Sequence, residues 1–259
     1  MGFFKKKHKN APFTGKAHRR TLHQNLGFTA AEQYKLLRTN LEFTVPEGTK
    51  CPVIGVTSSM RGEGKSTTAI NLSYVLAEKG SKVLLIDGDL RIPAVAKKMD
   101  IPSSPGLTDV LMGKCDQIEE WKSSLLDTWY ILPSGNIPPN PSELLGSKRM
   151  EATLEKFRNT FDYIVIDLPP VNIVSDALSI ANFITGLIVV VREGYTEKKE
   201  LERCVRQLKL SDVNLLGCVM NEVKSASGSY GKYKRNKYYK YDRYYYKDEY
   251  KVHSKESSK

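Results

Sequence analysis

The sequence predicts an α/β fold, in which a mainly parallel sheet carries helices on both faces. Short apolar runs rich in β-branched residues alternate with segments that have the helical period of hydrophobicity. Runs that are apolar throughout are typical of parallel strands buried on both faces. The expected strands lie near 53–57, 83–87, 129–132, 163–167, 187–192 and 215–221, and the expected helices near 65–79, 142–159, 175–183 and 197–209.

The first strand runs directly into a glycine-rich turn and then a helix. The turn reads Ser59-Met60-Arg61-Gly62-Glu63-Gly64-Lys65-Ser66-Thr67. This order predicts a phosphate-binding loop (P-loop), in which backbone N–H groups and the helix dipole hold phosphate. Lys65 would neutralise the outer phosphates, and Ser66 would ligate Mg²⁺. The alternative is an ordinary glycine-rich turn. The residues predicted to bind ATP here are Ser59, Arg61, Gly62, Glu63, Gly64, Lys65, Ser66 and Thr67.

Two further strands end in carboxylates. Asp87 and Asp89 follow the second strand, and Asp167 ends the fourth. Ligands of an open parallel sheet bind beyond the carboxyl ends of its strands, so these side chains are expected to converge on the metal and the γ-phosphate. Any one of them could instead be a helix cap or a turn residue.

The basic residues are concentrated at the two ends of the chain. Residues 1–23 hold 7 Lys or Arg and no acid, residues 224–259 hold 11 basic and 4 acidic residues, and the remainder holds 22 basic and 25 acidic. We therefore expect a basic N-terminal segment (1–27), one folded domain (28–223) and a disordered tail (224–259). Cationic ends suit an anionic membrane surface or an acidic partner, and simple solvation of a disordered end is the alternative.

The sequence also predicts a soluble, intracellular protein. No run approaches the roughly 18–20 apolar residues of a membrane span, and the first nine residues lack the apolar core of a signal peptide. The cysteines show no close pairing and no metal-binding spacing, which predicts reduced, structural thiols. They are Cys51, Cys115, Cys204 and Cys218.

The C-terminal tail is rich in tyrosine. Of the 14 tyrosines in the chain, nine lie between positions 230 and 250. With few aliphatic residues around them they cannot build a core, and beside a nucleotide-binding fold their phenols are predicted phosphate acceptors. Stacking on single-stranded nucleic acid is the competing interpretation, which we do not favour. The nine are Tyr230, Tyr233, Tyr238, Tyr239, Tyr241, Tyr244, Tyr245, Tyr246 and Tyr250.

Taken together, these motifs resemble those of the bacterial tyrosine kinases of capsule and exopolysaccharide synthesis. The form that they resemble is cytoplasmic, and its membrane-spanning activator is a separate chain. The resemblance extends from about residue 28 to the tail. It rests on the P-loop, the tyrosine cluster and four further runs: Glu32-Gln33-Tyr34-Lys35-Leu36-Leu37-Arg38, Asp87-Gly88-Asp89-Leu90-Arg91, Pro138-Pro139-Asn140-Pro141-Ser142-Glu143-Leu144-Leu145 and Asp162-Tyr163-Ile164-Val165-Ile166-Asp167.

The resemblance implies an ATP- and Mg²⁺-dependent protein-tyrosine kinase that phosphorylates its own tail between subunits of a homo-oligomeric ring. Asp87 would accept the phenol proton, Ser66, Asp89 and Asp167 would hold the metal, and Asn221 would contact the adenine. The implied partners are the cytoplasmic tail of the membrane-spanning activator, which would keep the kinase at the inner face of the membrane, and a cognate tyrosine phosphatase. No nucleic acid is implied.

Two positions depart from the family pattern. Arg61 stands where proline is common, which adds a cation at the nucleotide. The subunit-contact pattern reads Glu32-x-x-Lys35-x-x-Arg38, with lysine in place of the first arginine. Lysine cannot form a bidentate guanidinium fork, which would weaken ring assembly, and a merely solvated helix face is the alternative.

The helix that carries this pattern has further local features. Thr29 and Glu32 are expected to form a capping box at its start. Tyr34, Leu37 and Leu41 form an apolar stripe along it.

A non-kinase switch ATPase of the partitioning or cell-division-positioning class is the rival function. That class shares the fold and the carboxylates, but it carries a lysine five residues before the loop lysine. Here that position is Met60.

Overall fold

The computed structural model describes residues 26–223. The chain divides into two compact units, Met1–Asn221 and Glu222–Lys259, and the sheet and the P-loop belong to the first. All nine predicted phosphoacceptor tyrosines lie outside the described residues, so the segment boundaries at 27 and 223 stay predictions. Among the helices of residues 26–223, none combines the length and the apolar composition needed to cross a membrane.

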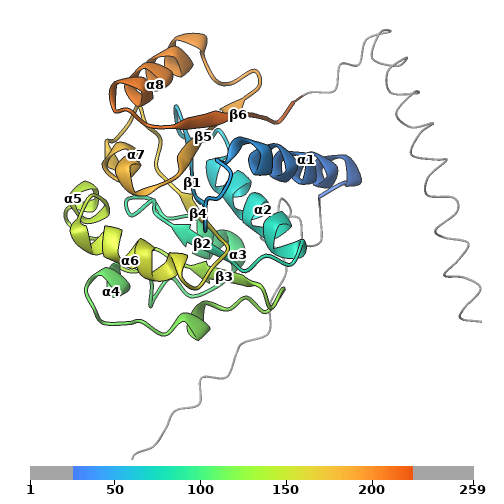
Figure 1. Ribbon diagram of the computed structural model, residues 1–259. Helices are drawn as coiled ribbons and strands as arrows, with labels where there is room; N and C mark the ends of the chain where they lie inside the picture. Colours follow the sequence, from blue (N-terminus) through green and yellow to red (C-terminus); the bar gives the residue numbers. More distant parts are fainter. Residues whose placement is uncertain (1–25, 224–259) are drawn as a thin grey trace, which may run out of the picture. The chain divides into compact units, whose positions relative to one another are not determined.

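The core of this unit is a six-stranded sheet in which every neighbouring pair is parallel. The strand order is β3-β2-β4-β1-β5-β6. The predicted α/β fold is confirmed, and all six strands form where the apolar runs predicted them (Figure 1). They are β1 (Val53–Ser58), β2 (Val83–Asp87), β3 (Trp129–Leu132), β4 (Tyr163–Asp167), β5 (Gly186–Arg192) and β6 (Leu215–Asn221).

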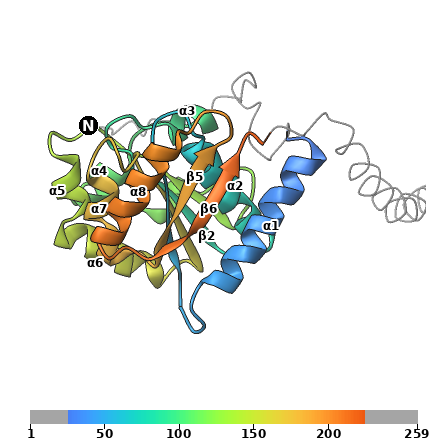
Figure 2. The ribbon, with the colours of Figure 1, turned by 90° about the horizontal axis from the view of Figure 1, so that it is seen from above.

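Helices cover both faces of the sheet (Figures 1 and 2). One face carries α1 (Phe28–Thr44), α2 (Lys65–Glu78) and α3 (Val95–Met99). The other carries α4 (Leu107–Leu111), α5 (Pro141–Leu145), α6 (Lys148–Arg158), α7 (Asp176–Ser179) and α8 (Lys198–Leu210). Short 3₁₀ turns lie at Ile118–Trp121 and Ala181–Phe183.

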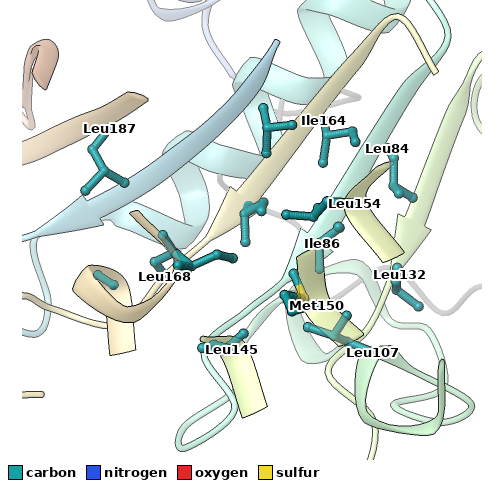
Figure 3. Packing of buried hydrophobic residues seen from close by; sticks show 14 of the residues in the cluster. Leu84, Ile86, Leu107, Leu132, Leu145, Met150, Leu154, Ile164, Leu168 and Leu187 are labelled. Carbon is teal, nitrogen blue, oxygen red and sulfur yellow. The ribbon is translucent and has the colours of Figure 1, made fainter. Parts of the chain in front are cut away.

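The two faces of the sheet define two hydrophobic clusters, because successive side chains of a strand point in opposite directions. In β2, Leu84 and Ile86 face the α4–α8 side, whereas Val83 and Leu85 face α2. Figure 3 shows the cluster on the α4–α8 side, where Leu154 of α6 packs over the sheet. Strands buried on both faces explain why these segments are apolar throughout.

Three local predictions were wrong. The helix expected at 142–159 is two helices, because the chain breaks at Gly146 and Ser147 begins α6 by accepting a hydrogen bond from the backbone N–H of Met150 (3.2 Å). The helix expected at 175–183 is the single turn of α7 followed by a 3₁₀ turn.

The third wrong prediction is the capping box of Thr29 and Glu32. Helix α1 begins at Phe28 after an N-cap at Gly27 that has no side-chain cap, so Thr29 already lies inside the first turn. The apolar stripe is as predicted: Leu41 is buried, and Tyr34 and Leu37 are partly buried against the α2 cluster.

Candidate active site

The turn between β1 and α2 has the backbone conformation of an anion-binding loop. Gly62 and Gly64 adopt φ values of +80° and +99°, a region that side chains disfavour. Helix α2 begins at Lys65 without a side-chain cap, so the N–H groups of its first turn and the positive end of its dipole are left for an anion. A Cβ at Gly64 would lie 1.9 Å from Nδ2 of Asn221, so a larger residue would be strained by its positive φ and would also have to displace the Asn221 side chain.

The structure brings the loop lysine and three carboxylates together. Lys65 Nζ lies 2.8 Å from Asp89 Oδ2 and 3.3 Å from Asp167 Oδ1. Asp87 and Asp167 are direct cross-strand partners at the carboxyl ends of β2 and β4. The side chains of Lys65, Asp89 and Asp167 are only 11%, 6% and 0% exposed, so their charges interact with little solvent screening.

Burial and mutual charge shift the pKa values of this cluster. Burial, assisted by the neighbouring charge of Asp167, raises the pKa of Asp87 to about 7. Burial likewise raises the pKa of Asp167, against the opposing effect of Lys65. Burial by itself would lower the pKa of Lys65, but the charges of Asp167 and Asp89 outweigh it and raise that pKa. Lys65 therefore stays protonated among the carboxylates.

The Asp87 carboxylate also fixes the start of α3. Its Oδ2 accepts hydrogen bonds from the backbone N–H groups of Ala94 (3.1 Å) and Val95 (2.9 Å). Its Oδ1 accepts a longer one from the N–H of Asp89 (3.3 Å). Asp89 in turn accepts from the N–H of Ile92 (3.0 Å). The loop after β2 is thus folded around its own carboxylates, which fixes their orientation.

The residues predicted to hold Mg²⁺ offer the oxygen ligands that this ion requires. Ser66 is buried, donates a hydrogen bond to Asp167, and has its Oγ 3.4 Å from Lys65 Nζ. Within residues 26–223, no group of three or more His, Cys, Asp or Glu side chains is arranged to hold a metal by itself. Mg²⁺ in general keeps several waters and binds proteins through few side chains together with substrate phosphates.

The remaining predicted nucleotide ligands lie in the loop, except Asn221, which ends β6 and contacts the loop, and several of them bond to other parts of the protein. The Glu63 carboxylate is buried and accepts from Ser59 Oγ (2.8 Å). Asn221, predicted at the adenine, donates from Nδ2 to the backbone oxygen of Glu63 (3.0 Å). Arg61 and Gly62 are exposed, and their backbone oxygens accept hydrogen bonds from the turn after β5.

Two contacts at the site have no signal in the sequence. Lys98 of α3 reaches Thr67 of the P-loop helix, with Nζ 3.2 Å from Oγ1. The last residue of β5, Arg192, and the turn after it bond to the P-loop, the turn through Tyr195 and Thr196. Neither segment carries a motif, so only the tertiary structure reveals these contacts.

An ion pair between the exposed Arg91 and the buried Asp176 connects the carboxylate loop to two helices. Arg91 binds Asp176 through two parallel bonds, Nε to Oδ2 (2.9 Å) and Nη2 to Oδ1 (3.0 Å). Ser142, at the start of α5, also donates to Asp176. Asp176 is fully buried, so this network ties the loop after β2 to the starts of α5 and α7. Arg91 and the Pro-Ser-Glu-Leu-Leu run, which are distant in the sequence, are thus linked through Ser142 and Asp176.

The predicted subunit-contact residues make contacts within the chain. Lys35 Nζ lies 2.9 Å from Glu32 Oε1 along α1. Arg38 Nη1 donates to the backbone oxygen of Val75 in α2 (2.7 Å). A subunit contact through Arg38 would therefore compete with the packing of α1 on α2.

Fold and loop together define a P-loop nucleotide-binding protein, and comparison with known proteins gives the family. A model of the AAA domain matches residues 51–221. The chain is 40% identical over 179 residues to tyrosine-protein kinase YwqD of Bacillus subtilis, which covers 69% of this chain and 76% of that protein. The chain belongs to the bacterial tyrosine kinases, as its motifs predicted.

Solved structures agree. The chimerical protein CapA2B2 matches with a TM-score of 0.70 and 32% identity, over 74% of this chain and 84% of that one. The kinase domain of Escherichia coli tyrosine kinase ETK matches with a TM-score of 0.68 and 30% identity, over 77% and 79%. The cell division ATPase MinD of Pyrococcus furiosus is less similar, with a TM-score of 0.55 and 26% identity over 68% and 74%.

Proposed function

We propose that the protein transfers the γ-phosphate of ATP to tyrosine hydroxyls, among them those of its own C-terminal tail, and so regulates capsular or exopolysaccharide synthesis and export. The observation that supports this best is the cluster of Lys65 with three carboxylates at the first turn of α2. Phosphoryl transfer needs positioning and charge neutralisation more than covalent chemistry, and this cluster offers both.

Each residue of the cluster has a distinct role in this proposal. Lys65 and the loop N–H groups bind the β- and γ-phosphates. Ser66, Asp89 and Asp167 hold Mg²⁺, directly or through water. The metal, when bound, neutralises charge on the phosphate oxygens.

Asp87 is the residue that we assign to the acceptor proton. A tyrosine hydroxyl has a pKa near 10, so a carboxylate with a pKa of about 7 has a modest gap to overcome. Oδ2 is held by two short backbone hydrogen bonds and Oδ1 by a single longer one. Oδ1 is therefore the better placed oxygen to receive the proton.

The acceptor tyrosines are those of positions 230–250, which follow the last strand. Their distance along the chain allows them to reach the site of a neighbouring subunit, and we propose transfer between subunits of a homo-oligomeric ring. The resemblance also supports a membrane-spanning activator whose cytoplasmic tail stimulates the kinase and keeps it at the inner face of the membrane. A cognate tyrosine phosphatase would reverse the modification.

The switch ATPase is the second candidate, and two observations disfavour it. Met60 occupies the position of the lysine that distinguishes that class, and its backbone N–H donates a hydrogen bond to Glu63 within the P-loop (2.9 Å). The kinase structures also match more closely than MinD does.

Intact-mass spectrometry of the full chain incubated with Mg·ATP tests the proposal. A kinase produces a ladder of steps of about 80 Da, one for each phosphate. A variant with the nine tail tyrosines changed to Phe should lose most of that ladder while it still binds nucleotide, which maps the acceptors. ATP hydrolysis without any mass increase in the unchanged chain would favour the switch ATPase and overturn the proposal.

A further inference from the structure

Glu63 places a fully buried carboxylate inside a loop whose task is to bind an anion. A negative charge that pointed at the phosphates would oppose their binding. Its two oxygens are instead held by the protein: Oε1 accepts from Ser59 Oγ (2.8 Å), and Oε2 accepts from the backbone N–H of Met60 (2.9 Å). The side chain therefore folds the loop back on itself.

A third hydrogen bond to Glu63 comes from a distant part of the chain. Thr196 Oγ1 donates to Glu63 Oε1 at 2.5 Å, across 133 residues of sequence. The same hydroxyl accepts from the backbone N–H of Arg192 (2.9 Å). Because a hydroxyl has a single proton, a bond accepted from Arg192 directs that proton towards the Glu63 carboxylate.

The turn that supplies Thr196 makes two further bonds to the P-loop. Arg192 Nη1 donates to the backbone oxygen of Gly62 (3.1 Å), and the Tyr195 hydroxyl donates to that of Arg61 (3.1 Å). The Arg192 guanidinium lies over the Tyr195 ring, 4.9 Å from its centroid. Residues 192–196 thus contact three consecutive residues of the P-loop, and we name them the P-loop clamp.

We propose that the P-loop clamp, acting through Thr196 and Glu63, positions the loop for nucleotide binding. Gly62 and Gly64 leave the loop backbone permissive, and the bonds of Glu63 to Ser59 and Met60 restrain it from within. The clamp adds restraint from outside the loop. Holding the loop in its binding shape before the nucleotide arrives lowers the ordering cost of binding. This inference rests on the proposed function only in taking a nucleotide as the ligand.

The clamp should affect binding more than chemistry, because it lies on one side of the site. It follows β5, which neighbours β1 on the side opposite to β4 and β2. Asp87 and Asp167, at the ends of β2 and β4, are placed by other parts of the chain: Asp87 by the loop after β2, and Asp167 by the pairing of β4 with β2. Thr196 and Glu63 are therefore positioning residues for nucleotide affinity.

The test compares Thr196→Val, which keeps the shape but removes the hydroxyl, with Thr196→Ser, which keeps the hydroxyl. Affinities for Mg·ADP and Mg·ATP are measured by calorimetry on the full chain, and hydrogen exchange reports the amides of residues 59–64. For Thr196→Val we expect about a tenfold rise in Kd and faster exchange in the loop, because a hydrogen bond to a charged, buried group is lost. The melting temperature should fall by no more than about 2–4 °C, the effect expected for one lost hydrogen bond in a domain of this size. The kcat at saturating ATP should change little, and Thr196→Ser should behave like the unchanged protein.

Three outcomes would overturn the proposal. The first is a Thr196→Val variant with unchanged Kd and loop exchange, and the second is a Thr196→Ser variant as impaired as Thr196→Val. The third is a rise in Kd accompanied by an equal loss of kcat or of melting temperature, which would indicate a general role in the fold. Tyr195→Phe provides a second variant, because it removes only the hydroxyl bound to Arg61 and should speed exchange in the loop. Failure of the kinase assignment would appear separately, as an absence of phosphotyrosine while these binding results stand.

Discussion

Replacing Lys65 with Met should destabilise the protein as well as abolish tyrosine phosphorylation. The substitution removes the ammonium group and leaves Asp89 and Asp167 in place, with side chains that are 6% and 0% exposed. Breaking a buried ion pair by removing one partner costs about 3–5 kcal/mol. At about pH 7.5 the free energy of unfolding should fall by about that amount, a large share of the roughly 5–15 kcal/mol typical of a domain.

The pH dependence of this loss identifies its cause. Burial raises the pKa of Asp167, and Lys65→Met removes the positive charge that opposes that effect. A carboxyl group with a folded-state pKa above its unfolded value makes the protein most stable at low pH and less stable as the pH rises through the folded value. Urea unfolding without nucleotide should therefore show a smaller deficit for Lys65→Met at about pH 5 than at about pH 7.5.

The double variant Lys65→Met with Asp167→Asn is the matched control. It removes the more deeply buried of the two uncompensated charges and leaves that of Asp89, so it should regain part of the lost stability while phosphotyrosine stays absent. If Lys65→Met is as stable as the unchanged protein at about pH 7.5, the buried-charge reasoning is wrong. It is equally wrong if the deficit is the same at about pH 5, or if the double variant is no more stable than the single one.

Three further expectations rest on contacts at the site. The kcat for tyrosine phosphorylation should rise with pH through about 7, as Asp87 loses its proton. The residual activity of Asp87→Asn should lack that step, and the same pH profile in both proteins would show that Asp87 is not the base. Lys98→Gln should weaken Mg·ADP binding severalfold in calorimetry, because Lys98 contacts the P-loop helix at Thr67. Lys97→Gln, the same change at an exposed neighbour, should leave the affinity unchanged, and equal losses of affinity would show that only the overall charge matters. Arg91→Lys should lower the free energy of unfolding by about 1–3 kcal/mol, because lysine cannot form both bonds to Asp176, and an unaltered urea midpoint would show that this pair contributes little.

The sequence predicted the sheet and the carboxylate cluster because both follow from local pattern and a general rule of topology. Val83–Asp87 and Tyr163–Asp167 are unbroken apolar runs that end in acid, and parallel strands place such ends at one edge. Helices were predicted less well where a short polar break decides the outcome, as at Gly146 and Ser147 between α5 and α6.

Contacts between distant segments that follow from no rule of topology could not be predicted from the sequence. Thr196 and Glu63 are 133 residues apart in the sequence, and no sequence pattern around either residue indicates that the two are in contact. Arg38 illustrates a related point: the resemblance implies a contact between subunits, which stays a prediction, and within its own chain Arg38 donates to the backbone oxygen of Val75. Sequence spacing tells which helix face a residue occupies, and the packing of that face decides its partner.

Helix α2 connects the phosphate-binding loop, at its first residue, with α1, which it contacts near its last turn. Its first residue is Lys65, and near its other end the backbone oxygen of Val75 receives Arg38, while Lys79 just beyond it pairs with Glu42 (2.8 Å). Fourteen helical residues span about 21 Å, and a helix of that length does not compress along its hydrogen-bonded axis. A displacement of α1 is therefore transmitted along α2 to the phosphate-binding loop, with no flexible loop in between.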